Sequence, residues 1–537
     1  MSAYRKEPDL YESEKDLEKN PVDAGVGNVP YQKRPSYVDA DGAVPGESFE
    51  LGDTWYAKMQ RLAGKLKMEQ RGIERVPENE RTDSKHPLLN TGSMWLAANM
   101  VISSFAIGAL GKSIWFLGTA DAMLVVLFFN LIGTLPVCYF SCFGPVFGLR
   151  QMVLSRFWFG WHGVKIIAVF NVLACIGWSS VNVIVGAQLL NAVNSDVPGW
   201  AGIIIIAFCT VLVTLFGYKV VHAYEFWSWI PTFIIFMILL GQYAHSGAFM
   251  DIPMGVGTSE IGGVLSFGAT VYGFATGWTP YAADYTVYQK STQSKRKVFF
   301  ATWLGLIIPL LFTEMLGVAV MSATGTDPEA TDNIYLNGYK AAGSGGLIGA
   351  VLIPPMGNFG RFCLVILALS IIANNCPNIY SVSLTVQVFG RWTQRLPRFI
   401  WTLVATGVYI AIAIPGYSHF ETVLENFMNF IGYWLAIYEG VALMEHFVFR
   451  RGFKGYIPEH YDHPNELPLG LAAVAAFCVG IAGVVLGMSQ VWFVGPIGLL
   501  CGEAPFGGDV GFELGFSWAA VSYLVFRPLE KRYLRDA

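Results

Sequence analysis

Twelve apolar segments, each near twenty residues long, follow one another along this chain from residue 92 onward. A helix needs about 20 apolar residues to cross a bilayer, and hydrocarbon admits only helices and closed barrels because every backbone group must be paired there. Very few folds are open to such a chain. We therefore predict an all-α protein that crosses the membrane about twelve times, with spans at 93–116, 119–143, 163–191, 200–217, 222–245, 262–287, 298–322, 360–387, 397–414, 419–447, 468–488 and 511–527.

Charged residues are concentrated at the amino-terminal end of the chain. Of the 74 Asp, Glu, Lys and Arg residues, 31 lie in the first 90 positions, although the whole chain is 54% hydrophobic and 14% charged. This distribution predicts a cytoplasmic tail over 1–90 followed by a membrane body. Within the tail, 54–76 is predicted to be either an interfacial amphipathic helix or a solvated helix packed on the body. The net charge of −4 gives no indication of nucleic-acid binding.

Basic residues in the connecting loops set the expected orientation. Lys and Arg gather in alternate loops, such as 290–297, 391–398 and 450–454, whereas the loops between them carry few, mainly Lys340. By the positive-inside rule the basic loops face the cytoplasm, and so do both termini. The alternation also supports the span count, since one missed span would break it. We expect a multi-pass protein of the plasma membrane.

Two of the predicted spans contain helix-breaking sequences. Span 1 has Gly108–Gly111 after Ser103-Ser104, and span 6 has Gly277-Trp278-Thr279-Pro280. Breaks at matching positions five spans apart predict two five-helix repeats, which are inverted because five is odd. The alternative is ordinary glycine contacts between closely packed helices. The repeats would occupy 91–250 and 251–450, followed by two additional spans over 451–528 and a short cytoplasmic tail over 529–537.

A polar cluster interrupts span 8. The sequence Asn374-Asn375-Cys376-Pro377-Asn378 puts three side-chain amides and a proline into an otherwise apolar stretch. Unpaired polar groups cost several kcal/mol each in hydrocarbon, so the cluster should face a protein interior or a watery cavity. Proline also frees a backbone carbonyl one turn earlier. Polar side chains and loosened backbone at membrane depth are typical of a solute-binding site in a transporter.

Span 3 carries a second polar pair. Trp178 and Asn182 are four residues apart and therefore share one helix face. The indole can stack on a planar heterocycle, and the amide can hydrogen-bond to its edge. Trp278, at the predicted break of span 6, is a second stacking candidate, with Phe274 as its rival. The alternative is a structural amide beside a space-filling tryptophan.

Three motifs then indicate a family. Their order and sequence resemble the purine–cytosine permeases, the Fcy-type fungal branch of the nucleobase–cation symporters, and the resemblance covers about residues 68–530. The motifs are Gly-Trp-Ser-Ser-Val-Asn at 177–182, Gly-Trp-Thr-Pro-Tyr-Ala-Ala-Asp-Tyr-Thr at 277–286 and Asn-Asn-Cys-Pro-Asn-Ile-Tyr-Ser at 374–381. The resemblance implies the leucine-transporter fold, two inverted five-helix repeats plus two extra helices, and uptake of cytosine and purines with protons. The substrate-binding residues it implies are Ser104, Trp178, Asn182, Trp278, Asn374, Pro377 and Asn378.

The coupled ion is predicted to be a proton. Ala368-Leu369 stands where sodium-driven relatives carry a cation-binding Ser/Thr pair, although Ser370 one place on keeps the register open. Proton coupling needs an ionisable group inside the membrane. Glu225 in span 5 is the first candidate and Asp284 in span 6 the second. The other intramembrane carboxylates considered are Glu314, Glu421 and Glu425.

Other functions remain to be separated from nucleobase import. A related planar heterocycle, such as a B6 vitamer or a thiamine-like compound, would suit the same residues, and so would a nutrient receptor that moves no solute. An enzyme is not expected, because the chain has no HExxH, no GxSxG and no His/Cys cluster. The eight cysteines lie in or beside apolar segments without metal-ligand spacing, so no metal or cofactor is expected. The expected partners are a nucleobase, a proton and the lipid bilayer.

Overall fold

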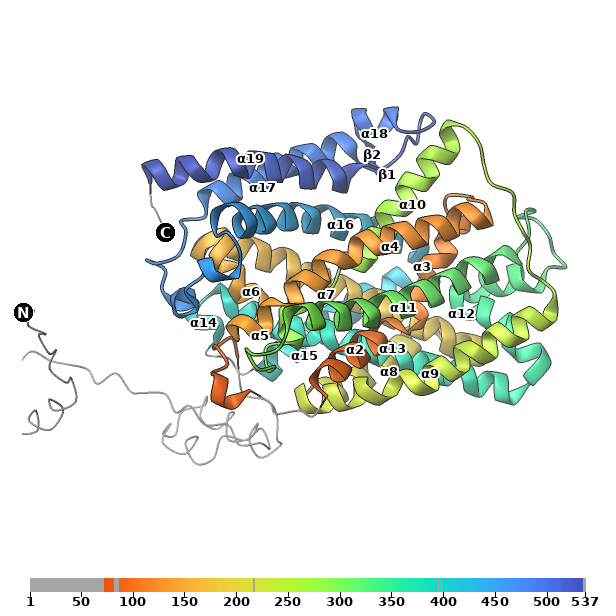
Figure 1. The fold of residues 1–537 in the computed structure, drawn as a ribbon. Coiled ribbons are helices and arrows are strands. Elements are labelled where there is room, and N and C mark those ends of the chain that lie inside the picture. Colours follow the sequence, from red (N-terminus) through yellow and green to blue (C-terminus); the bar gives the residue numbers. More distant parts are fainter. Residues whose placement is uncertain (1–71, 82–85, 216–217, 395, 397, 535–537) are drawn as a thin grey trace, which may run out of the picture. The chain divides into compact units, whose positions relative to one another are not determined.

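A computed structural model describes residues 72–81, 86–215, 218–394, 396 and 398–534, with the backbone alone at 218–225, 391 and 421–423. This part of the chain is almost entirely helical (Figure 1). Its one hairpin pairs β1 (Ser489–Gln490) with β2 (Phe493–Val494). The long helices are α4 (Thr119–Ser141), α7 (Arg156–Val193), α8 (Gly199–Leu215), α9 (Tyr218–Ser246), α10 (Thr258–Thr276), α11 (Lys295–Ser322), α12 (Ile334–Met356), α13 (Asn358–Thr385), α15 (Arg398–Gly416), α16 (Phe420–Met444), α17 (Leu471–Gly487) and α19 (Gly511–Tyr533).

Shorter helices connect or extend these. The short α-helices are α2 (Pro87–Asn99), α3 (Ile102–Ser113), α5 (Phe143–Phe147), α6 (Gln151–Leu154), α14 (Arg391–Gln394) and α18 (Pro496–Leu500). The 3-10 turns are η2 (Glu78–Glu80), η3 (Thr279–Tyr285), η4 (Val386–Phe389), η5 (Tyr417–His419), η7 (Phe453–Gly455) and η8 (Pro458–Asp462), and η6 (Glu445–Phe449) is a π-helical turn. The helix expected over 54–76 lies mostly outside the described residues, and its described end, 72–76, is not helical.

Every predicted span coincides with a helix or a pair of helices. Among the described residues, seven helices are long and apolar enough to cross a membrane, and the bent pair α2–α3 brings the number to eight. The other four predicted spans fall on α8, α10 with η3, α17 and α19, which are shorter or more polar. A multi-pass membrane protein is therefore supported, whereas the count of twelve stays a prediction.

The first span bends at a different place from the one predicted. Helices α2 and α3 meet at Met100–Val101 with a bend of 50°, and Gly108 lies inside α3. The predicted break at Gly108–Gly111 is therefore wrong. Gly108 serves close packing: a Cβ there would come 1.9 Å from the Glu314 carbonyl oxygen on α11. Gly317 faces it in the same way, with a Cβ placed 2.1 Å from the Phe105 carbonyl oxygen.

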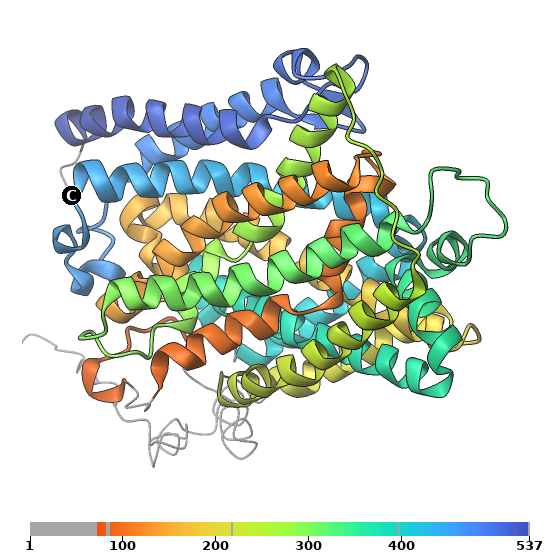
Figure 2. The same cartoon turned by 45° about the vertical axis from the view of Figure 1, so that its right-hand side comes forward.

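The sixth span breaks where the sequence predicts. Helix α10 ends at Thr276 and η3 begins at Thr279, so Gly277-Trp278 forms the joint. The packing of spans 1 and 6 is also related: α3 of span 1 packs on α11, and α10 of span 6 packs on α4 (Figure 2). Span 1 thus meets span 7, and span 6 meets span 2, which is the relation that two five-helix repeats require.

The carboxyl-terminal helices form a layer beside α16. Helices α17 and α19 pack on each other, and both contact α16 (Figure 1). A buried guanidinium holds this layer: Arg527 Nε lies 3.2 Å from Glu445 Oε2, and Arg527 Nη1 lies 2.9 Å from Glu530 Oε2. This ion-pair cluster lies near the carboxyl-terminal ends of α16 and α19.

Candidate functional site

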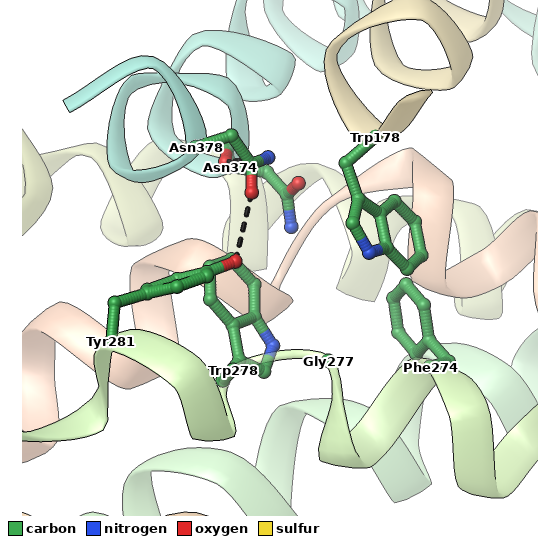
Figure 3. A pocket seen from close by; sticks show the side chains of 7 residues that line it. All are labelled: Trp178, Phe274, Gly277, Trp278, Tyr281, Asn374 and Asn378. Atoms are coloured by element: carbon green, nitrogen blue, oxygen red, sulfur yellow. Dashed lines mark hydrogen bonds between the residues drawn. The ribbon is translucent and has the colours of Figure 1, made fainter. Parts of the chain in front are cut away.

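A small cavity lies at the break of span 6. Residues from three spans border about 190 Å³ of space there, part of which is open to solvent. One aromatic residue comes from α7, four residues come from α10, η3 and the joint between them, and two amides come from α13 (Figure 3). The lining residues are Trp178, Phe274, Gly277, Trp278, Tyr281, Asn374 and Asn378. The polar cluster of span 8, the tryptophan of span 3 and the joint of span 6 thus meet at one place.

Two aromatic pairs form facing walls of the cavity. The Trp178 and Phe274 rings lie 5.1 Å apart on one side, and the Trp278 and Tyr281 rings lie 5.7 Å apart on the other (Figure 3). Gly277 lies in the wall between them, where a Cβ would come 3.3 Å from Trp178 Nε1. Both tryptophans named from the sequence therefore reach the same space. Either ring could stack on a flat solute in this space.

The indole of Trp278 also links the two broken spans. Its Nε1 donates to Asn99 Oδ1 at 3.0 Å, and Asn99 is the last residue of α2. Asn99 Nδ2 in turn donates to the Trp95 carbonyl at 2.9 Å, and the rings of Trp95 and Trp278 are 5.5 Å apart. The carbonyl of Asn99 accepts from Ser104 Oγ at 2.7 Å. Ser104 therefore supports the bend of span 1 and is not a lining residue.

Two amides of α13 supply the polar part of the cavity. Asn378 Oδ1 accepts from the Tyr281 hydroxyl at 2.9 Å, and its Nδ2 donates to the Asn374 carbonyl at 3.1 Å. Asn374 Nδ2 donates to the Ala98 carbonyl at 2.5 Å. Four residues apart, both amides lie on the helix face that meets the cavity. Pro377, between them, is buried but does not line the cavity.

Asn182 lies behind the cavity in a chain of hydrogen bonds. Its Oδ1 accepts from Ser103 Oγ at 2.7 Å, and its Nδ2 donates to Asn374 Oδ1 at 2.7 Å. The side chain is fully buried and is not among the lining residues. The chain joins α3, α7 and α13 and holds Asn374 from behind. Ser103, which makes this contact, was missed because the sequence does not tell which of two adjacent serines faces span 3.

The two carboxylates named for proton coupling lie away from the cavity lining. Asp284 Oδ1 accepts from the backbone N–H of Gln151 at 2.7 Å, at the first residue of α6. Asp284 is buried and joins η3 to the start of the α6–α7 segment. The side chain of Glu225 lies outside the described residues, and so does that of Glu421.

Two other buried carboxylates stand out. Glu439 on α16 accepts from the hydroxyls of Tyr272 at 2.8 Å, of Thr279 at 3.1 Å, and of Thr276. Glu314 on α11 accepts from Asn130 Nδ2 at 2.7 Å. Sequence reasoning weighed Glu314 but overlooked Glu439, although a carboxylate in the interior of the span at 419–447 was itself a signal.

The cavity carries no formal charge. Of the described residues, those that line it include no Asp, Glu, Lys, Arg or His. The polar partners it offers are amides, a phenol and indoles, which bind neutral groups through directed hydrogen bonds. Within the same described ranges, no group of three or more His, Cys, Asp or Glu residues could hold a metal ion. The arrangement therefore suits a neutral, flat solute with donors and acceptors on its edge.

Comparison with known proteins gives a consistent result. Residues 75–496 match the model of a family described as permeases for cytosine/purines, uracil, thiamine and allantoin. The chain is 65% identical to the purine-cytosine permease fcyB of Emericella nidulans, over 96% of this chain and 98% of that protein. It is 31% identical to the vitamin B6 transporter TPN1 of Saccharomyces cerevisiae, over 89% of this chain and 90% of that protein.

A solved structure shares the fold. The nucleobase-cation-symport-1 family transporter Mhp1, in a closed conformation with bromovinylhydantoin bound, superposes with a TM-score of 0.63 at 15% identity. The match covers 86% of this chain and 95% of Mhp1. The predicted leucine-transporter-like helical fold is thereby confirmed. The domain boundaries stay predictions.

Proposed function

Because this chain belongs to the family of permeases for cytosine/purines, uracil, thiamine and allantoin, we propose that it imports cytosine and purine nucleobases across the plasma membrane. Import occurs by alternating access in symport with protons, and both termini face the cytoplasm. The observation that carries the proposal is the uncharged cavity at the span 6 joint, with aromatic walls and two amides. A nucleobase has the matching form, a flat π-system with amide-like donors and acceptors on its edge.

Each residue of the predicted site has a role in this proposal. Trp178 and Trp278 stack on the two faces of the base. Asn378 gives up its hydrogen bond with the Tyr281 hydroxyl and hydrogen-bonds to the edge of the base instead. Asn374 is the second amide, and Asn182 holds it through their hydrogen bond. Ser104 acts from behind, by supporting the bend of span 1 that brings Asn99 to the Trp278 indole.

The proposed coupling ion is a proton. A neutral base does not respond to membrane potential, so accumulation needs a charge that moves with it. Ala368 and Leu369 offer no side-chain oxygen to a sodium ion at the position where sodium-driven relatives bind one. Glu225 and Asp284 are the carriers proposed from the sequence.

Uptake of labelled bases tests this function directly. In cells that lack their own permeases, the chain should accumulate cytosine, adenine, hypoxanthine or guanine, with initial rates that rise as the external medium is acidified. A protonophore should abolish accumulation, and replacing sodium by choline should leave it unchanged. Uptake that follows sodium and ignores the protonophore would contradict the proposed ion. Binding without net flux would show a receptor.

Pro377 provides a test of the helix itself. Proline has no N–H, so the carbonyl of Ala373 one turn earlier lacks its usual helical donor. Pro377→Ala supplies that donor and stiffens α13 beside the cavity, without removing a polar group from the lining. We expect the maximal uptake rate to fall several-fold while KM changes by less than about twofold. A large rise in KM at an unchanged rate would contradict this role.

A second candidate substrate comes from the comparison with the vitamin B6 transporter. A B6 vitamer is also a flat heterocycle with hydroxyl groups on its edge, and the same walls and amides could hold it. Unlabelled pyridoxine in the uptake assay separates the two. Competition by pyridoxine at lower concentration than cytosine would favour the vitamin, and competition only at a large excess would favour the nucleobase.

A further inference from the structure

Glu439 occupies a position that the proposed substrate contacts leave unexplained. Its side chain is buried in α16, and one carboxylate oxygen accepts from Thr276 and from Thr279, the latter at 3.1 Å. The other oxygen accepts from the Tyr272 hydroxyl at 2.8 Å. The Thr276 and Thr279 hydroxyl oxygens also lie 3.0 Å apart, but each hydroxyl has one proton and donates it to Glu439, so neither donates to the other. A single carboxylate therefore accepts hydrogen bonds from three hydroxyls, which come from both halves of span 6.

Two of these hydroxyls belong to residues that flank cavity-lining residues in the sequence. Thr276 is the last residue of α10 and Thr279 the first of η3, and the two residues between them, Gly277 and Trp278, line the cavity. Any movement of this joint against α16 changes the contacts of Glu439. The carboxylate is thus linked to the proposed substrate site through two residues of backbone.

Nothing basic compensates the charge of Glu439. Among the described residues, no Lys, Arg or His forms a hydrogen bond or ion pair with it. The titratable groups in this region are Tyr272 on α10, Tyr438 on α16 itself, Asp284 on η3 and Glu513 on α19. All of them are acids. The three hydroxyls are therefore the groups that stabilise the negative charge of Glu439. Without their hydrogen bonds, the buried carboxylate would take up a proton.

We propose that Glu439 carries the coupled proton and exchanges it as the span 6 joint moves against α16. In the present arrangement the hydroxyls of Tyr272, Thr276 and Thr279 donate to the carboxylate. When the joint moves away, water on the external side delivers a proton to a carboxylate oxygen. When the joint returns, the hydroxyls displace that proton to water on the cytoplasmic side. This inference rests on the proposed proton symport and assigns its carrier to Glu439 in place of Asp284 or Glu225.

Proton movement in proteoliposomes tests the assignment. Purified protein is reconstituted with a pH-sensitive dye in the lumen, and cytosine is added outside at symmetric pH. The wild-type protein should acidify the lumen as cytosine enters. Glu439→Gln keeps the shape but cannot cycle a proton, so lumen acidification should be lost while exchange of labelled for unlabelled cytosine continues. Glu513→Gln is the matched control, since this neighbouring carboxylate lies off the joint, and it should behave as wild type.

The outcomes separate the inference from the function on which it rests. A wild-type protein that imports cytosine without moving protons overturns the proton symport and, with it, the Glu439 assignment, but leaves nucleobase import standing. If the wild-type protein couples cytosine to protons but Glu439→Gln still acidifies the lumen, only the assignment to Glu439 is overturned. The same holds if Glu225→Gln loses lumen acidification while Glu439→Gln retains it. Loss in Glu513→Gln as well would overturn it too, because the effect would not be specific to the joint.

Two further variants keep the test decisive if Glu439→Gln does not reach the membrane. Glu439→Asp keeps a carboxyl group and should retain acidification. Thr279→Val removes one donor and leaves the carboxylate, so the pH of half-maximal uptake should move upward by about one unit. An unchanged pH profile in Thr279→Val would overturn the proposal. Loss of acidification in Glu439→Asp, at normal cytosine exchange, would do the same.

Discussion

Replacing Asn378 by alanine is expected to weaken nucleobase binding by about 5- to 150-fold, the largest loss of affinity that we predict for a single residue. Asn378 lines the cavity, and its Oδ1 is held by the Tyr281 hydroxyl. Its removal leaves a donor or acceptor of the bound base unpaired in a site shielded from water. An unpaired buried group costs about 1–3 kcal/mol, which corresponds to that range of affinity.

The chain contains a matched control for this variant. Asn375 is on the same helix but faces away, and its Nδ2 lies 3.4 Å from Thr210 Oγ1 on α8. Asn375→Ala should therefore change cytosine KM by less than about twofold. Tyr281→Phe should change cytosine KM only slightly, because it removes a hydroxyl that the bound base would displace from Asn378 in any case. Kinetics of labelled cytosine uptake, corrected for surface expression, decide the matter. Unchanged KM in Asn378→Ala would refute its assignment to the substrate site.

Replacing Gly108 by alanine is expected to lower the free energy of unfolding by about 3 kcal/mol, near the upper end of the usual cost of overpacking. A Cβ at this position would lie 1.9 Å from the Glu314 carbonyl oxygen and 2.9 Å from its Cα. These obstacles are backbone atoms, so no side-chain rotation relieves them. Helices α3 and α11 would have to separate, and the bend at Met100–Val101 would move with α3.

Gly407→Ala is the control for this packing prediction. Gly407 is also helical, in α15, and nothing lies within 4 Å of a Cβ built on it. Alanine there should leave stability unchanged or raise it by about 0.5–1 kcal/mol, because glycine is the poorer helix former. The melting temperatures of the purified variants in detergent should fall by several degrees for Gly108→Ala only. Equal melting temperatures would show that α3 and α11 are not in close contact.

The sequence alone determined the helical class, the positions of the long helices, the polar cluster of span 8 and the break at Gly277-Trp278. These features depend on composition and local backbone chemistry. Hydrocarbon admits a backbone only when it is internally paired, and amides at membrane depth need partners, so both constraints can be recognised without coordinates. The spacing of Trp178 and Asn182 and the predicted break at Trp278 also indicated two stacking rings, and both rings line the cavity.

The tertiary structure decided everything that depends on which helix faces meet. Glycines at 108–111 could mean a break or a close contact, and only the approach of α11 shows that Gly108 makes a contact. The same holds for Ser103, which reaches Asn182 where Ser104 supports the bend, and for Glu439, whose hydroxyl partners come from a helix more than 150 residues away in sequence. A side chain's hydrogen-bond partner is set by the rotation and offset of neighbouring helices. Local sequence does not specify these quantities, because they are the collective result of packing the whole bundle.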